Sequence, residues 1–161
     1  MRIGQGYDIH PLRVGRRLIL GGIEIPFAKG LDGHSDADAL THAVCDAILG
    51  ALGEGDLGGH FPSSNPQFKD LDSLAMLKDV ATLMETKGFQ LVNLDCCILA
   101  EAPKLSPYLK PMAERLARVL AVESHQINVK VKSGEGLGAI GRGEGIGAQA
   151  VCLLQRRPLH Q

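Results

Sequence analysis

Three side chains with metal-binding chemistry occur near the start of the chain. Asp8 and His10 are two residues apart, and His42 follows in a segment with helical periodicity. On a strand, residues two apart point to the same face, so the Asp8 carboxylate and the His10 imidazole would lie side by side. Two imidazoles and one carboxylate, with a fourth position open, match a catalytic zinc site. Asp38 and Asp46 share a helix face with His42, and either could orient its ring.

A glycine-rich segment near the C-terminus could bind phosphate. Seven glycines fall within residues 134–147. Backbone amides exposed at glycine, the hydroxyl of Ser133 and the basic side chains of Lys132 and Arg142 suit phosphate oxygens. Glu135 could hold a hard divalent cation that bridges phosphates. The segment is not a P-loop, because no Gly-Lys-Ser/Thr ends it.

Two loops could contact the rest of a ligand. Asp56 lies among glycines, which permit close backbone approach, and could accept hydrogen bonds from a sugar hydroxyl. The segment from Ala100 to Leu105 follows a strand end, and its small residues and prolines could form a slot for a flat base. Each feature also has an ordinary explanation: a chance Asp-x-His pair, a solvated polar helix face, a flexible loop or a glycine-rich hairpin.

The elements that must position these residues alternate between strands and helices. Strands are predicted at 2–9, 91–100, 127–131 and 147–154, with a hairpin or bent strand at 18–25; helices at 36–52, 70–87 and up to Leu120; and loops at 27–35 and 54–69. Residues 133–147 fit neither periodicity. This order predicts an α+β, ferredoxin-like sandwich with one mixed sheet and helices packed on one face.

The composition limits the classes of protein that remain. The 161 residues predict a single domain, 1–161, and 45% hydrophobic residues supply a core. The net charge of −1 argues against nucleic acid or a membrane surface as partner. Without a signal peptide or an apolar run of about 20 residues, we expect a cytoplasmic protein, or one from a plastid-type organelle if a transit peptide has been removed. The cysteines form no Cys-x-x-Cys pair and are expected to be inert core thiols: Cys45, Cys96, Cys97 and Cys152.

Taken together, the motifs strongly resemble those of the 2-C-methyl-D-erythritol 2,4-cyclodiphosphate synthase family. The matching motifs, in order over residues 1–155, are Gly-Tyr-Asp-Ile-His at 6–10, His-Ser-Asp-Ala-Asp at 34–38 with His42, Asp-Leu-Gly at 56–58 with Phe-Pro at 61–62, Ala-Pro-Lys at 102–104, and Gly-Arg-Gly-Glu-Gly at 141–145. The resemblance implies conversion of 4-diphosphocytidyl-2-C-methyl-D-erythritol 2-phosphate to the cyclic diphosphate and CMP, in non-mevalonate isoprenoid synthesis. It also implies a homotrimer with active sites between adjacent subunits.

The resemblance further implies a role for individual residues. Zinc falls on Asp8, His10 and His42, one ion per subunit, and a magnesium or manganese ion falls on Glu135. His34 and Ser133 fall at positions that stabilise the transition state. Substrate-binding positions are Asp8, His10, His34, Ser35, Asp56, Leu57, Gly58, Phe61, Ser63, Ala100, Ala102, Pro103, Lys104, Leu105, Lys132, Ser133 and Arg142.

The chain departs from the family pattern at three places. Ser63 replaces a usual acidic residue, so one contact to the methylerythritol part is expected to differ. Ser133-Gly134 replaces Thr-Thr and keeps one hydroxyl, and Ala139-Ile140 replaces Phe-Thr beside a central trimer cavity, which Arg142 could still face.

Two other functions stay open at this point: a zinc phosphodiesterase that uses a zinc-bound water, and a non-catalytic binding module with structural zinc. Three protein ligands favour catalysis, because structural zinc sites normally close with four.

Overall fold

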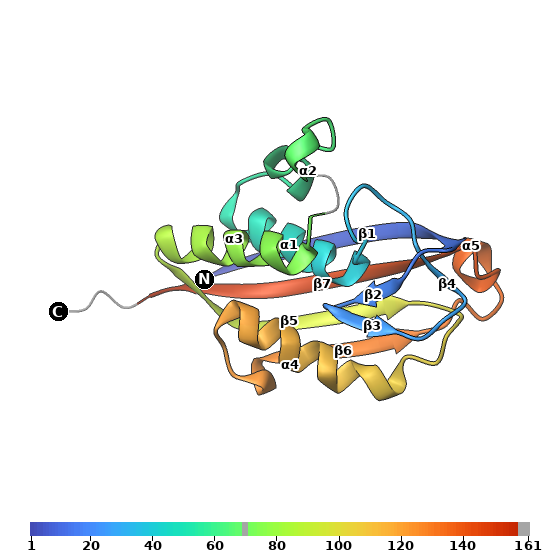
Figure 1. The fold of residues 1–161 in the computed structure, drawn as a ribbon. Helices are drawn as coiled ribbons and strands as arrows, with labels where there is room; N and C mark the ends of the chain where they lie inside the picture. Colours follow the sequence, from blue (N-terminus) through green and yellow to red (C-terminus); the bar gives the residue numbers. More distant parts are fainter. Residues whose placement is uncertain (69–70, 158–161) are drawn as a thin grey trace.

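The protein folds around a five-stranded sheet with helices and a small two-stranded hairpin, arranged as in Figure 1. The computed structural model describes residues 1–68 and 71–157. The strands are β1 (Arg2–Val14), β2 (Leu18–Leu20), β3 (Ile23–Ile25), β4 (Lys29–Leu31), β5 (Phe89–Leu99), β6 (Ile127–Lys132) and β7 (Gly145–Arg156). The helices are α1 (Ala39–Leu52), α2 (Leu57–His60), α3 (Ser73–Thr86), α4 (Leu109–Leu120) and α5 (Gly138–Gly141), with short 3-10 turns at Pro66–Phe68, Ser106–Tyr108 and Ser124–Gln126.

The sheet is mixed, as the sequence predicts. Its strand order is β4-β1-β7-β5-β6, and the β2–β3 hairpin forms a separate two-stranded sheet. β5 and β6 pair in parallel, whereas β7 runs antiparallel to both of its neighbours, β1 and β5. β1 and β5 are therefore parallel to each other with β7 between them, and the helices that connect them complete the predicted split βαβ unit.

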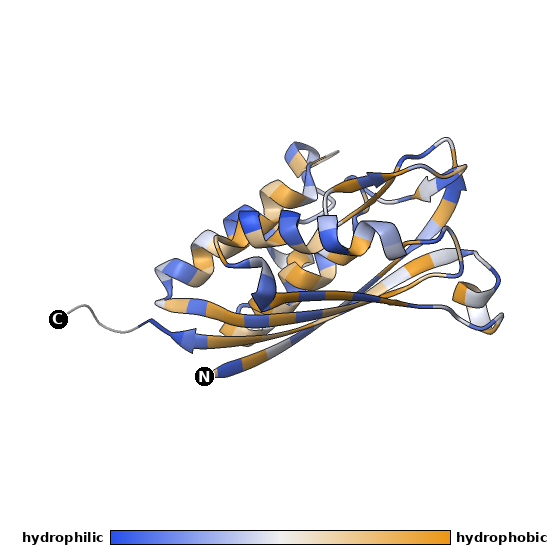
Figure 2. Cartoon of the chain, turned by 90° about the horizontal axis from the view of Figure 1, so that it is seen from below, coloured by the Kyte–Doolittle hydropathy of each residue, from blue (hydrophilic) through white to orange (hydrophobic). Residues whose placement is uncertain are grey.

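The long helices cover one face of the sheet, which confirms the predicted layering (Figures 1 and 2). Hydropathy changes in short bands along the strands, as expected when successive side chains point to opposite faces (Figure 2). On the helix side, β1 presents the buried Gly4 and Gly6 and the partly buried Asp8 and His10. Its other face leaves Ile3, Tyr7 and Ile9 exposed at 73%, 46% and 44%. Val151 of β7 is also exposed. This open face carries more apolar surface than solvent contact alone would favour.

Two glycines let α1 lie unusually close to β1. A Cβ at Gly4 would fall 1.8 Å from the carbonyl oxygen of Ala47, and one at Gly6 would fall 2.0 Å from that of Ala43. Both distances are far inside van der Waals contact, so no other residue fits without moving the helix. Small residues on both elements bring His42, beside Ala43, within reach of the strand.

Several segments differ from the sequence prediction. β1 runs to Val14 rather than residue 9, because its partner changes at Pro11 from β7 to β4. Residues 29–31, predicted as loop, form β4 on that extension. The predicted loop at 54–69 contains α2, and residues 133–147 contain α5. α3 begins at Ser73, while residue 70, where the helix was predicted to begin, lies outside the described residues.

The cysteines are free, and most are buried in the core. Cys45, Cys96 and Cys152 are at most 1% exposed. Burial raises the pKa of Cys96 to about 12 and that of Cys152 to about 11, so neither forms a thiolate readily. In the part of the chain that the structure describes, no helix has the length and apolar character needed to cross a membrane.

Candidate metal centre and active-site cavity

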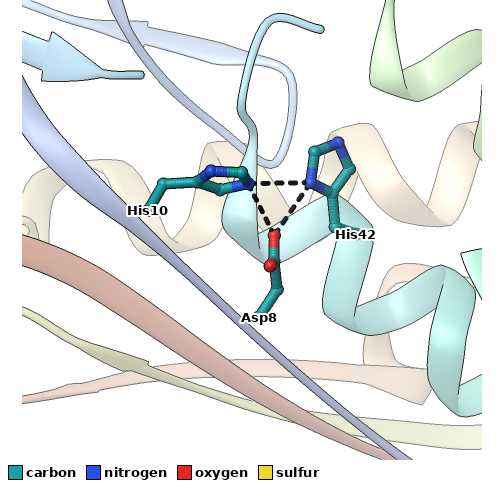
Figure 3. A group of neighbouring side chains, drawn as sticks. All are labelled: Asp8, His10 and His42. Carbon is teal, nitrogen blue, oxygen red and sulfur yellow. Dashed lines mark hydrogen bonds and ion pairs between the residues drawn. The ribbon is translucent and has the colours of Figure 1, made fainter. Parts of the chain in front are cut away.

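Asp8, His10 and His42 come together from β1 and α1 and point toward one another (Figure 3). Asp8 Oδ2 lies 2.9 Å from His10 Nε2 and 2.8 Å from His42 Nδ1, and the two ring nitrogens are 3.3 Å apart. A tetrahedral zinc ion with bonds of about 2.0–2.1 Å would hold its ligand atoms about 3.3 Å apart. The cluster is therefore close to the size of a zinc site. Among the described residues, it is the only such group of three or more His, Cys, Asp or Glu.

The opposite nitrogen of each imidazole has its own partner. His10 Nδ1 lies 3.1 Å from the carbonyl oxygen of Asp32, to which it can donate only as N–H. His42 Nε2 lies 2.8 Å from Ser73 Oγ and 3.2 Å from Ser35 Oγ. With these nitrogens protonated, His10 Nε2 and His42 Nδ1 keep their lone pairs for a metal ion. The donor set thus fits a divalent cation in chemistry as well as in spacing.

Neither Asp38 nor Asp46 orients the His42 ring, so this prediction is wrong. Asp38 is the N-cap of α1 and is fully buried, where it accepts hydrogen bonds from the backbone of Gly21, Gly22 and Thr41 and from the Thr41 hydroxyl. Burial nevertheless raises its pKa. Asp46 Oδ1 instead accepts a hydrogen bond of 2.7 Å from the amide of Leu57.

Two side chains of the cluster, Asp8 and His42, have shifted pKa values. Burial raises the pKa of Asp8, but hydrogen bonds to His10 and His42 and their nearby charge outweigh it and hold that pKa well below its usual value. Burial lowers the pKa of His42, yet the hydrogen bond and charge of Asp8 raise it overall. Asp8 thus favours the protonated form of His42, and a cation bound at Nδ1 would displace that proton.

The cluster opens into a cavity of about 290 Å³. The cavity is lined by Asp8, His10, His34, Ser35, His42, Asp46, Leu57, Gly58, Phe61, Ser63, Phe68 and Met76. Nine of these were predicted as site residues from sequence. Phe68 and Met76 were missed, because an apolar residue in a loop or on a helix carries no signal that separates cavity lining from core.

Hydrogen bonds from Arg16 fix the loop that carries His34 and Ser35. The guanidinium donates to the carbonyl oxygens of Leu31, Gly33 and Ser35 at 3.2, 3.2 and 3.1 Å. Three donors of a rigid fork fix three points of the loop. Sequence reasoning missed this residue, since nothing local distinguishes Arg16 from the exposed Arg17 beside it.

The remaining predicted residues form a second group. The segments 100–105 and 132–135 meet at the ends of β5 and β6, where the amide of Ala100 donates to Lys132 O at 3.0 Å and that of Gly134 donates to Glu101 Oε2 at 3.1 Å. The Ser133 hydroxyl donates to Glu135 Oε1 at 2.7 Å. Among the described residues, none of this group lines the cavity at the metal cluster in the same chain.

Two other predicted contacts lie at the surface. Asp56 caps α2 and accepts a hydrogen bond of 2.8 Å from the amide of Gly59, which leaves its second oxygen for a ligand. Arg142 forms an exposed ion pair with Glu144, whose carboxylate raises the pKa of the guanidinium further. Neither residue lines the described cavity.

Fold and site together define an α+β protein with a candidate catalytic divalent-metal centre in an open cavity. The model of the YgbB family matches residues 1–155, and the chain belongs to this family. It is 54% identical to 2-C-methyl-D-erythritol 2,4-cyclodiphosphate synthase of Bacillus pumilus, over 98% of this chain and 99% of the relative.

Solved structures agree with this assignment. IspF of Plasmodium falciparum, in complex with CDP, superposes with a TM-score of 0.87 at 36% identity and covers 98% of this chain and 97% of its own. The bifunctional IspDF of Campylobacter jejuni gives a TM-score of 0.93 at 38% identity over 96% of this chain. The present chain spans 42% of that longer protein.

Proposed function

We propose that this protein converts 4-diphosphocytidyl-2-C-methyl-D-erythritol 2-phosphate to 2-C-methyl-D-erythritol 2,4-cyclodiphosphate, with release of CMP, in the non-mevalonate pathway. The observation that carries the proposal is the Asp8–His10–His42 cluster facing a cavity. The family membership of nearly the whole chain supports it, as does the CDP bound by a structural neighbour. The whole chain, 1–161, would form one synthase domain in the cytoplasm or a plastid-type organelle.

Asp8, His10 and His42 would hold one zinc ion, and Glu135 would hold magnesium or manganese with the substrate diphosphate. A divalent ion bound there acts as a Lewis acid and template at phosphate oxygens. The Asp8 carboxylate keeps its negative charge over a wide pH range because its pKa is depressed. His10 and His42 each present one lone pair, since their other nitrogens face a carbonyl or hydroxyl oxygen.

The reaction needs no nucleophile from the protein. An oxygen of the substrate's 2-phosphate forms the new bond to the β-phosphorus, and the bond from that phosphorus to the bridging oxygen breaks, so that CMP leaves with the electron pair. Holding the chain of the substrate in a ring-closing pose can contribute up to about 7–11 kcal/mol. His34, on the Arg16-braced loop, and the hydroxyl of Ser133 would donate to the developing negative charge.

The recognition groups would bind the organic parts of the substrate. The free oxygen of Asp56 would accept from the ribose, the segment 100–105 would contact cytosine and the nearby phosphate, and Lys132 would neutralise phosphate charge. Leu57, Gly58, Phe61 and Ser63 surround the cavity where the methylerythritol part would lie.

A homotrimer with active sites between subunits would join the two groups of residues. In one chain, neither Ser133 nor Glu135 lines the cavity at the metal cluster. The exposed Ile3, Tyr7, Ile9 and Val151 on the open face of the sheet supply apolar area for such an assembly. Arg142 would face an anionic ligand at the trimer axis.

Incubation with the substrate plus zinc and magnesium, followed by phosphorus NMR, tests the proposal. A cyclic diphosphate and CMP are expected, without oxygen from ¹⁸O-labelled solvent. A linear product with solvent oxygen would instead identify a zinc phosphodiesterase. Stoichiometric zinc without any turnover would identify a non-catalytic binding module. His42→Ala serves as the matched control, because it removes one metal ligand and is expected to abolish CMP release.

A further inference from the structure

The partner of His42 on the side away from the metal centre is a fully buried hydroxyl. Ser73, at the start of α3, is 0% exposed, and its Oγ lies 2.8 Å from His42 Nε2. The other nitrogen, Nδ1, faces Asp8 Oδ2 at 2.8 Å. The contact between Ser73 and His42 joins residues 31 positions apart in the chain.

A carboxylate fixes the direction of the Ser73 hydroxyl. Ser73 Oγ donates to Asp36 Oδ1, and the amide of Ser73 donates to Asp36 Oδ2 at 3.0 Å. An ionised carboxylate can only accept, and a serine hydroxyl has a single proton. Because that proton goes to Asp36, Ser73 can only accept from His42.

The single proton of the Ser73 hydroxyl determines the tautomer of His42. Nε2 must carry hydrogen to make its bond to Ser73, and the neutral ring then has its lone pair on Nδ1. Ser35 Oγ, at 3.2 Å, could satisfy either tautomer of the ring by rotating its hydroxyl. Of the two hydroxyls at Nε2, only that of Ser73 therefore requires hydrogen on this nitrogen, which leaves Nδ1 for a metal ion.

We propose that Ser73 and Asp36 are positioning residues for the metal centre, which act through His42 by fixing its tautomer and ring orientation. The inference rests on the zinc site of the proposed function and adds a line of hydrogen bonds from Asp36 through Ser73 to His42. It also explains why α3 begins against the loop that precedes α1 (Figure 1). Neither residue would touch substrate.

Zinc affinity of the full-length protein, measured by competition with a chromophoric chelator, tests the proposal. Ser73→Ala and Asp36→Ala are each expected to bind zinc about 10–100-fold more weakly, the usual effect of losing an outer partner of a histidine ligand. Because both act through one ring, the double variant should be no weaker than Ser73→Ala alone. In the zinc-loaded native protein, the Nε2 proton of His42 should give a slowly exchanging downfield NMR signal, which Ser73→Ala should lose.

Asp72→Ala is the matched control. Asp72 is adjacent to Ser73 and caps the same helix through the amide of Leu74, but it is exposed and does not contact His42. It should lower stability slightly and leave zinc affinity unchanged. If Ser73→Ala fails to fold, Asp36→Ala decides alone, because Asp36 lies in a partly exposed loop.

Three results would overturn the proposal: native zinc affinity in Ser73→Ala and Asp36→Ala, an equal loss in Asp72→Ala, or additive losses in the double variant. Failure of the proposed function would appear instead in the product assay of the native chain, which would bind zinc but release no cyclic diphosphate.

Discussion

Substitution of Gly6 by alanine would test whether the close approach of α1 to β1 sets the metal site. The added Cβ would lie 2.0 Å from Ala43 O, 2.7 Å from the amide nitrogen of Ala47 and 2.9 Å from Asp46 Cβ. Ordinary contacts of a Cβ begin at 3.4 Å, so the backbone of α1 would have to retreat by about 1.4 Å. Two of the three clashing atoms are backbone, which no rotamer change can relieve.

The size of this displacement sets the expected loss of stability. Overpacking of a close-packed interface costs about 1–3 kcal/mol, and a backbone clash belongs at the upper end. For a chain of this size, about 2–3 kcal/mol lowers the Tm by roughly 5–10 °C. Since His42 precedes Ala43 on α1, the retreat would also carry its ring away from Asp8, and zinc affinity should fall.

Thermal unfolding of the zinc-free protein and chelator competition for zinc measure the two effects separately. Gly50→Ala is the control, because Gly50 lies on the exposed side of the same helix. A Cβ added there would lie 3.8 Å from the carbonyl oxygen of Gln5, an ordinary contact. Alanine there should stabilise the helix by about 0.5–1 kcal/mol and leave zinc binding unchanged. A Gly6→Ala protein with native Tm and native zinc affinity would refute the reasoning.

Four further predictions follow from the same contacts. The depressed pKa of Asp8 adds stability above its unfolded value of 3.8, and the raised pKa of His42 adds stability below its unfolded value of 6.5, which is lost as pH rises through the folded pKa. The zinc-free protein should therefore gain most from this pair between those values; urea unfolding across pH checks this, and an unchanged pH profile in Asp8→Asn would contradict it. Asp38→Ala should lower the free energy of unfolding by roughly 3–5 kcal/mol, since it loses a helix cap and leaves the buried amide of Gly21 and the partly buried amide of Gly22 without an acceptor. A loss below about 1 kcal/mol would show that water replaces the carboxylate. Arg16→Ala should raise KM and leave zinc content unchanged, because it removes the hydrogen bonds that fix the His34 loop. Arg17→Ala should behave like the native enzyme. Equal kinetics for both variants would contradict the role given to Arg16. Ser133→Ala should lower kcat more than it weakens substrate binding, and a mainly KM effect would instead mark a ground-state contact.

The proximity of the candidate ligands Asp8, His10 and His42 could be predicted from sequence because both relevant periodicities are local. Asp8 and His10 share a strand face, and His42 occupies one position of a helix that must bury its apolar side against that strand. The layering of helices over a mixed sheet follows from the same patterns.

The outer partners of His42 could not be predicted in this way. Helical spacing placed Asp38 beside His42, but its position as N-cap turns the carboxylate back toward backbone amides. The residues that do contact the ring, Ser35 and Ser73, come from a loop and from a different helix. Such contacts depend on how α1 and α3 pack, which a one-dimensional pattern does not contain.

The short strand β4 was missed for a related reason. Residues 29–31 are too few to show alternation, and they become a strand only because β1 continues past Pro11 and offers Leu12 as a pairing partner. Likewise, the sequence singles out Ser133 and Glu135, but a single chain gives them no place at the metal cluster.

Because the side chains of β1 alternate between two faces, a metal ion bound at Asp8 and His10 would favour one strand register. β1 pairs residue by residue with β7 from Arg2 to Pro11. A slip by one residue would turn Tyr7 and Ile9 toward α1 and move both ligands to the opposite face. The slipped strand would present side chains where only Gly4 and Gly6 fit, and it would lose the metal. Zinc present during refolding should thus increase the yield of correctly paired chains, because it binds only one of the competing registers.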